Sequence, residues 1–268
     1  LSGRGTPPNV QLSERDLGDR VALSLSGKVP LEGAAMSWTR RVSAPLYYAG
    51  HVFAETLSVA GIRAPKQIQP GSCAQDAPLI ALRDSPPLAQ LLARLGKDSD
   101  NFAAEMLAKT LGAERKQQPA TTADGVAVVK ETLQGMGLPL EGVSLVNGSG
   151  LFQGNQVTTQ LMSQLLVAMY QNPGLRPEFV AHLAVGGVDG TLSKRFQQLP
   201  APRVVRAKTG TLADVIALSG YVLGPKPERA YAFSYLANGV NGKQAQAREL
   251  IDKVVRLLAA QLYGIVDT

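Results

Sequence analysis

Two short segments, far apart in the chain, carry side chains that suit proton transfer and carboxylate binding. Ser99-Asp100-Asn101 supplies a hydroxyl and an amide, and Lys208-Thr209-Gly210-Thr211 supplies an ammonium and two hydroxyls. A positioned serine hydroxyl can relay a proton, and an asparagine amide can hold a substrate carbonyl. A strand that ends in Lys-Thr-Gly can place its ammonium and a hydroxyl near a substrate carboxylate, while Gly210 leaves room for a substrate backbone. Together, the two segments favour acid–base chemistry on a substrate with a carboxylate end.

Each segment also has a plainer interpretation. Asp98 or Ser99 is a suitable N-cap for a helix, so the first segment is also explained as a simple helix start. Lys208–Thr211 is also explained as an exposed strand end with a turn glycine. Asn147–Leu151 favours a tight structural turn, with substrate contact as the alternative. It is not a Gly-x-Ser-x-Gly nucleophile elbow, because asparagine stands at the position of the first glycine.

The other potential ligands and nucleophiles are isolated from one another. The glycine-rich loop Val185–Gly190 lacks the Gly-x-x-x-x-Gly-Lys-Ser/Thr pattern of a phosphate-binding loop. His51 and His182 have no metal-ligand spacing around them, and Cys73 has no visible activating base. We therefore predict no metal ion, no other cofactor and no catalytic thiol.

Composition narrows the functional classes. The chain has 268 residues, of which 45% are hydrophobic and 18% charged, as in an ordinary globular domain. The net charge is +6, but the basic residues are scattered without aromatic interleaving, so we predict no nucleic-acid partner. No apolar stretch is long enough for a transmembrane segment. The chain starts at Leu1 without a signal-peptide pattern or an initiator methionine, and we expect it to begin mid-protein.

The elements that must position these side chains follow from the hydrophobic periodicity. Residues 1–40 have a β-rich pattern, and residues 44–60 predict a helix with a buried face at Tyr48, Val52 and Leu57. After Pro202 the pattern predicts three strands and then an amphipathic helix over 245–262. The strands are expected at 203–209, 215–223 and 230–237. Further helices are expected at about 85–95, from Phe102, around 126–136 and after a cap at Thr158 or Thr159, with a possible short strand at 78–82. A helical block, an antiparallel meander and a terminal helix predict an α+β fold.

Five segments in order carry a more specific signal. They are Lys97–Glu105, Val146–Leu151, Gly187–Leu192, Ala207–Leu212 and Leu218–Tyr221. This combination resembles the class C penicillin-binding proteins of the D-alanyl-D-alanine carboxypeptidase/endopeptidase type. The resemblance spans roughly residues 41–268. It departs from the family pattern Asp-Gly-Ser-Gly-Leu-Ser at Asn147 and Phe152.

The resemblance implies a fold, an activity and a set of roles. The fold would be the penicillin-binding transpeptidase or β-lactamase-like fold, an antiparallel sheet flanked by helices beside an all-helical part. The family hydrolyses D-Ala-D-Ala termini or cross-links of peptidoglycan peptides through an acyl-enzyme. It works outside the cytoplasmic membrane, in the periplasm of Gram-negative bacteria, and β-lactam antibiotics acylate it. By the same resemblance Ser99 would relay a proton, Asn101 would contact the substrate amide, and Lys208 would supply positive charge. Thr209 and Thr211, with Gly210 between them, would bind the terminal carboxylate and the substrate backbone.

The family's nucleophile-bearing segment, Ser-x-x-Lys, is not found in this chain. No lysine here has a serine three residues before it, and the nearest approach, Thr191-Leu-Ser-Lys194, lies between the other motifs. We expect a missing N-terminal segment to carry the nucleophile, so that this chain alone is inactive. Residues 1–40 would then be the tail of an inserted β-rich subdomain, and residues 41–268 a penicillin-binding domain that is incomplete at its N-terminus.

Two other hypotheses stay open. The chain could be a non-catalytic module that binds peptidoglycan or β-lactams after loss of the nucleophile. The gene sequence upstream of Leu1 distinguishes this case, because a Ser-x-x-Lys there supports the enzyme. The chain could also be an unrelated α+β protein with chance matches, which predicts that Ser99 and Lys208 lie far apart.

Overall fold

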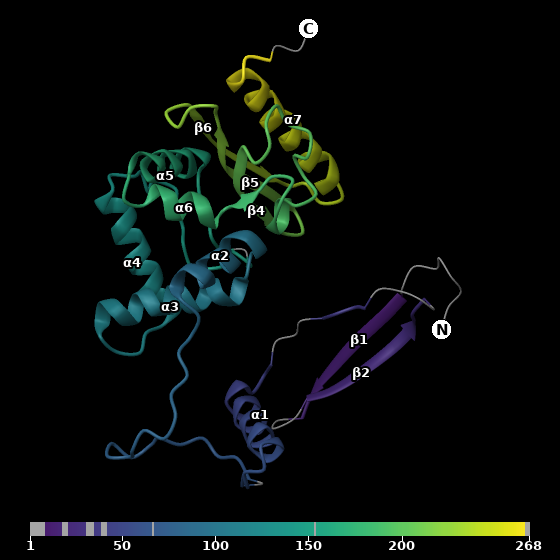
Figure 1. The fold of residues 1–268 in the computed structure, drawn as a ribbon, viewed down its shortest axis with the longest axis vertical. Helices are drawn as coiled ribbons and strands as arrows, with labels where there is room; N and C mark the ends of the chain where they lie inside the picture. The colour runs from purple at the N-terminus through teal and green to yellow at the C-terminus, as the bar shows by residue number, and fades with distance from the viewer. Residues whose placement is uncertain are drawn as a thin grey trace. The chain divides into compact units, whose positions relative to one another are not determined.

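The computed structural model describes residues 9–17, 21–30, 35–38, 42–65, 67–152 and 154–265, and it divides into two compact units, residues 1–83 and 84–268. The smaller unit contains an antiparallel pair of strands, β1 (Asn9–Asp16) and β2 (Val21–Lys28), and one helix, α1 (Pro45–Val59) (Figure 1). Proline suits the first turn of α1, where its missing N–H removes no helical hydrogen bond. The strand pattern and the helix are confirmed, and the domain boundary at residues 40/41 stays a prediction.

Two expectations in the smaller unit are wrong. α1 has no buried residue, so Tyr48, Val52 and Leu57 do not form the expected buried face. Residues 78–82 form no strand, and Leu79, Ile80 and Leu82 are exposed. A short apolar segment forms a strand only where a neighbouring strand makes hydrogen bonds to its backbone. No described strand pairs with residues 78–82.

The larger unit is built around an antiparallel sheet in the order β3-β4-β5-β6. Its strands are β3 (Ala184–Val185), β4 (Val205–Thr211), β5 (Val215–Leu223) and β6 (Ala230–Asn238). The three strands expected after Pro202 are confirmed, although β4 begins two residues later and runs on through Thr211. This extension places the whole Lys208–Thr211 segment on the strand itself.

Helices cover both faces of this sheet (Figure 1). In β5, Ile216, Leu218 and Val222 pack into the core under α7 (Gln244–Leu262), which contributes Ile251 and Val255. Tyr221 points to the opposite face, where it packs with residues of α5 (Thr159–Gln171) and α6 (Arg176–His182). This alternation is the period of two that a strand with both faces covered requires. Thr158 caps α5, as expected, by accepting from the Leu161 N–H at 3.0 Å.

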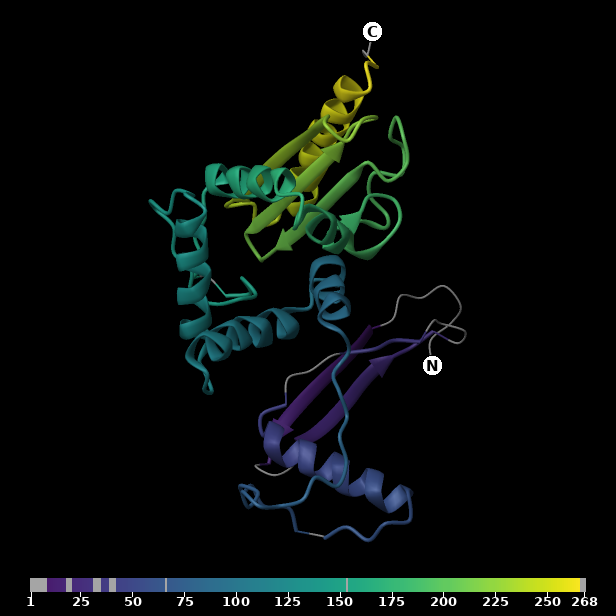
Figure 2. The same cartoon turned by 60° about the vertical axis from the view of Figure 1, so that its left-hand side comes forward.

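The all-helical part consists of α2 (Leu88–Asp98), α3 (Asn101–Lys116) and α4 (Thr122–Gly135) (Figure 2). α3 and α4 approach very closely at Gly125, where an added Cβ would lie 1.7 Å from the carbonyl oxygen of Ala108. The close approach fixes α3 relative to α4, and α3 follows directly on the Ser99 turn. α2 packs beside α6, so the helical part lies against the sheet-bearing part.

Candidate active site

The structure brings the two chemically interesting segments into contact. The Lys208 ammonium donates a hydrogen bond of 2.7 Å to Ser99 Oγ, across 109 residues of sequence. The same Nζ donates to the carbonyl oxygen of Thr209 at 2.8 Å. Burial lowers the pKa of Lys208 below its usual value, since a partly desolvated ammonium gives up its proton more readily. The contact contradicts the hypothesis of an unrelated fold with chance matches.

Ser99 occupies the turn between α2 and α3. Its backbone is left-handed, with φ 60° and ψ 48°, a conformation that costs a residue with a Cβ about 1–2 kcal/mol. Asp100 is the N-cap of α3, and its Oδ1 accepts from the Ala103 N–H at 3.0 Å. The expectation that Asp98 or Ser99 caps this helix is wrong, because α2 runs through Asp98 and only Asp100 has the extended backbone of an N-cap. The turn leaves the Ser99 side chain directed at Lys208.

Asn101 lies apart from this contact. It is exposed in the first turn of α3, two residues after Ser99, and makes no side-chain hydrogen bond to any residue that the structure describes. Its amide is therefore open to an incoming ligand.

The rest of the Lys208–Thr211 segment faces a cavity of about 350 Å³. Thr209 Oγ1 donates to Thr191 Oγ1 at 2.9 Å, which joins β4 to the short 3-10 helix η1 (Gly190–Leu192). The cavity is lined by Thr191, Lys194, Arg195, Thr209, Gly210, Thr211, Ile216, Ala217 and Arg248. Three of these residues are cationic and none is acidic, but Arg195 is paired with Asp252, so the charge that favours an anionic group comes from Lys194 and Arg248.

The outer edge of β4 is open beside this cavity. β3 pairs with β4 only at Arg206 and Ala207, and no other described strand pairs with that edge beyond them. Gly210 faces Ala217 across the ladder, where an added Cβ would lie 3.2 Å from the Ala217 Cβ. The open edge and the missing side chain leave space for an extended ligand backbone.

The Asn147–Leu151 segment is held as a turn beside α3. Asn147 Oδ1 accepts from the Gly150 N–H at 2.7 Å, and Glu105 Oε1 accepts from the Ser149 N–H at 2.9 Å. Burial alone would raise the pKa of Glu105, but the hydrogen bonds from the Ser149 region bring it below its usual value. Glu105 is therefore an ionised anchor that fixes the loop to the same helix that begins at Asn101.

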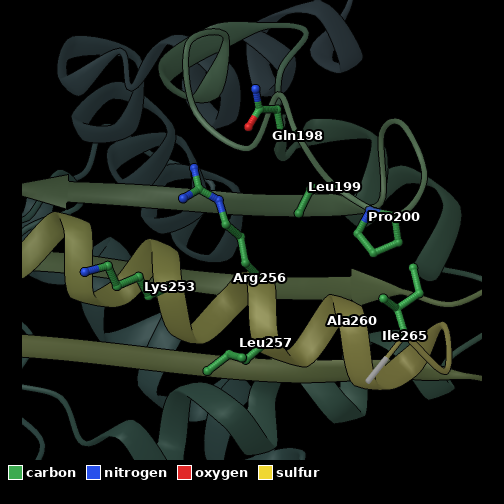
Figure 3. Close-up of a pocket in the computed structure, with 8 residues that line it drawn as sticks. All are labelled: Gln198, Leu199, Pro200, Lys253, Arg256, Leu257, Ala260 and Ile265. Carbon is green, nitrogen blue, oxygen red and sulfur yellow. The ribbon is translucent and has the colours of Figure 1, made fainter. Parts of the chain in front are cut away.

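A second, larger cavity lies away from these residues (Figure 3). Its volume is about 590 Å³, and its two basic side chains, Lys253 and Arg256, project from α7. It is lined by Gln198, Leu199, Pro200, Lys253, Arg256, Leu257, Ala260 and Ile265. None of the predicted site residues borders this cavity. Cavity size alone therefore does not identify the candidate active site in this protein.

Comparison with known proteins agrees with this geometry. The sequence profile of the D-Ala-D-Ala carboxypeptidase 3 (S13) family matches residues 3–261. The chain belongs to this family. It is 35% identical over 250 residues to a D-alanyl-D-alanine carboxypeptidase of Actinomadura sp. strain R39, covering 90% of this chain and 46% of that protein. It is 31% identical over 194 residues to the D-alanyl-D-alanine carboxypeptidase DacB of Haemophilus influenzae, covering 72% and 40%.

A solved structure shares the fold of this family member. Penicillin-binding protein 4 of Haemophilus influenzae, solved in complex with a β-lactam, superposes with a TM-score of 0.76 and 25% identity. The match covers 96% of this chain and 59% of that one. The predicted α+β fold of the penicillin-binding type is confirmed. The chain spans about half the length of the curated relatives it matches.

Several site residues were not predicted from the sequence. Thr191 contacts Thr209, and Arg248 comes to the cavity from the start of α7. Thr191 lies in the Gly187–Leu192 segment, which resembles the family pattern. Its residue type alone, however, does not indicate a role in the site. Arg248 had no signal, since one arginine on an amphipathic helix is usually a solvated side chain. Within the described part of the chain, no His, Cys, Asp and Glu side chains group to hold a metal, and no helix is long and apolar enough to cross a membrane.

Proposed function

We propose that this chain is the proton-relay and carboxylate-binding part of a serine DD-peptidase. The substrate is a D-Ala-D-Ala terminus or cross-link of peptidoglycan, and the nucleophilic serine lies outside the chain. The observation that carries the proposal is the 2.7 Å contact of Lys208 Nζ with Ser99 Oγ, two groups 109 residues apart. Such a contact between an ammonium and a hydroxyl is the arrangement that a proton relay needs.

Ser99 is suited to protonate the leaving group. In acylation a base that lies with the nucleophilic serine outside this chain takes the serine proton, and the serine oxygen bonds to the carbonyl carbon of the penultimate residue. The C–N bond breaks, and the leaving amine needs a proton. Because Ser99 Oγ accepts from Lys208, its own hydroxyl hydrogen is free to pass to that amine. Lys208 then returns a proton to Ser99, and burial favours this transfer by lowering the pKa of the ammonium. Water later cleaves the acyl ester, with the proton transfers reversed.

The cationic cavity is suited to the carboxylate end of the substrate. Thr209 and Thr211 offer hydroxyls, while Lys194 and Arg248 contribute positive charge to the lining. The open edge of β4 at Gly210 would pair with the extended peptide, which brings the scissile carbonyl toward Ser99 and Asn101. A β-lactam carries the same carboxylate, so β-lactam antibiotics are proposed as a second class of ligand. Because peptidoglycan lies outside the cytoplasmic membrane, the proposed location is extracytoplasmic, which in a Gram-negative cell is the periplasm.

The second candidate is a non-catalytic module that binds peptidoglycan or β-lactams. It is favoured by one specific observation, the lack of a Ser-x-x-Lys in this chain. It predicts the same carboxylate site and the same cavity. It differs in predicting that no covalent adduct forms.

Labelling with a fluorescent penicillin separates the two candidates. The complete gene product and this chain alone are each incubated with the probe and run on a denaturing gel, after circular dichroism has shown that both are folded. We expect a covalent band from the complete product and none from this chain. The absence of a band from the folded complete product contradicts the peptidase. Mass spectrometry of products from a D-Ala-D-Ala peptide and from a cross-linked dimer then assigns carboxypeptidase or endopeptidase activity.

A further inference from the structure

An ion pair ties the helix that ends beside Ser99 to the loop before η1. The Lys97 ammonium lies 2.8 Å from Asp189 Oδ2 and donates to the carbonyl oxygen of Leu183 at 3.1 Å. The other carboxylate oxygen of Asp189 accepts from the Val185 N–H at 2.7 Å. Asp189 therefore makes one contact within its own loop and a second contact to α2. The two side chains are 23% and 34% exposed, so solvent screens their interaction only in part.

The backbones on the two sides of this pair are also in close contact. Gly190 follows Asp189 with φ +54°, and an added Cβ there would lie 2.3 Å from the carbonyl oxygen of Lys97. Only glycine fits this approach in that conformation. The loop therefore rests directly on the last turn of α2, two residues before Ser99.

The same loop leads into the carboxylate cavity. Thr191 follows Gly190 and accepts the hydrogen bond from Thr209, while β3, just before the loop, pairs with β4 at Arg206 and Ala207. The Lys97–Asp189 pair thus connects the turn that carries Ser99 with both flanks of the strand that carries Lys208. Among the residues that the structure describes, no other ion pair gives such a connection: Lys116–Asp124, for example, joins only α3 to the start of α4.

We propose that Lys97 and Asp189 are positioning residues that hold Ser99 at hydrogen-bond distance from Lys208 and Thr191 at its place in the cavity. The proposal rests on the proposed function for its kinetic consequence, but the geometry itself has a separate readout. Neither residue touches the reacting atoms. Both act by fixing the left-handed Ser99 turn, which has an intrinsic backbone cost and persists because its surroundings hold it.

Loss of the pair should affect rate far more than stability. A displacement of about 1 Å at a reacting group can cost roughly 10²-fold in rate. A partly exposed ion pair, in contrast, contributes only about 0–1 kcal/mol to folding. The Lys97→Met variant should therefore acylate about 10–100-fold more slowly with little change in Tm. Loosening also admits water to Lys208, so its pKa should move up toward the ordinary lysine value.

The test compares Lys97→Met, Asp189→Asn, Lys97→Arg and the control Lys116→Met in the complete gene product. Lys116→Met removes a lysine–aspartate ion pair of the same chemistry that lies away from the site. Acylation by fluorescent penicillin is followed over pH, Tm is measured by calorimetry, and the pKa of Lys208 is measured by NMR of ¹³C-labelled lysine. We expect Lys97→Met and Asp189→Asn to slow acylation, to shift its lysine-dependent limb to higher pH and to raise the pKa of Lys208. Lys97→Arg should largely restore the rate, and Lys116→Met should leave rate and pH profile unchanged.

The outcomes separate this inference from the proposed function. If the wild-type protein does not react with penicillin but the pKa of Lys208 rises in Lys97→Met and Asp189→Asn and not in Lys116→Met, the proposed function fails and the positioning role stands. If the wild type reacts and Lys97→Met reacts at the same rate with the same pH profile, the positioning role is overturned. The positioning role is also overturned if the acylation rate of Lys97→Met falls only in proportion to the fraction of folded protein while its pH profile is unchanged.

Discussion

The sharpest prediction concerns Lys208, which we would replace with methionine in the complete gene product. Methionine keeps the length of the side chain and its packing but removes the ammonium that lies 2.7 Å from Ser99 Oγ. Loss of one preorganised donor in an active site typically costs about 10²–10³ in rate, or about 2.7–4 kcal/mol of transition-state stabilisation. We therefore expect acylation by penicillin to fall by at least about 100-fold.

The same substitution should not reduce stability. Burial is the cause of the lowered pKa of Lys208, which means that the folded state disfavours the charged form. Between the lowered pKa and the usual value of 10.5 the unfolded chain binds more protons than the folded one, so the stability of the wild type rises with pH across that window. At neutral pH the wild type carries the full cost of the buried charge, and Lys208→Met removes it. We expect a Tm equal to or above that of the wild type.

Stopped-flow acylation and calorimetry on the same samples test both halves of this prediction. Lys226→Met is the matched control, because it removes an exposed lysine from the turn between β5 and β6. A variant that acylates at the wild-type rate would refute the role of Lys208. A Tm that falls together with the rate would show that the substitution damages the fold, and the assignment of the rate loss to the missing ammonium would then be wrong.

Two further predictions concern the helical part. Gly125→Ala should lower the free energy of unfolding, measured in urea, by about 1–3 kcal/mol, because the new methyl group would meet the Ala108 carbonyl oxygen. This loss should exceed the gain from the better helix propensity of alanine. An unchanged urea midpoint would show that α3 and α4 can separate at no cost. Asp124 has its pKa lowered from 3.8 to about 2 by Lys116 and Thr121, so it stabilises the fold above pH 3.8 and this stabilisation is lost as the pH falls toward 2. The Tm difference between wild type and Asp124→Asn should therefore be constant above about pH 5 and shrink toward pH 2, and a difference independent of pH would contradict the lowered pKa.

The sheet and the two chemical segments could be predicted because their signals are local. The pattern of apolar residues predicts β5 and β6, and the residue types of Ser99 and Lys208 indicate the chemistry that these side chains can do. Their contact followed only from resemblance to a family, since no local pattern says which two segments meet across 109 residues.

The Ser99 turn could not be predicted for a definite physical reason. Asp98, Ser99 and Asp100 are all good N-cap residues, and propensity cannot choose among them. The choice depends on where α2 ends, and Lys97 in the last turn of α2 contacts Asp189 of a distant loop, which local sequence does not reveal. The wrong assignments of α1 and residues 78–82 have a related cause, since periodicity indicates an apolar face but not what covers it.

The pleat of β4 explains how one short segment serves two tasks. Val205 and Ala207 are fully buried against the core under α7, which fixes the register of the strand. Alternation then directs Lys208 to the opposite face, toward Ser99, and Thr209 toward Thr191 and the cationic cavity. A slip of one residue would exchange the two faces and bury the ammonium in the core. Proton transfer and carboxylate binding are therefore kept apart, yet adjacent, by the same two buried side chains that hold the strand in the sheet.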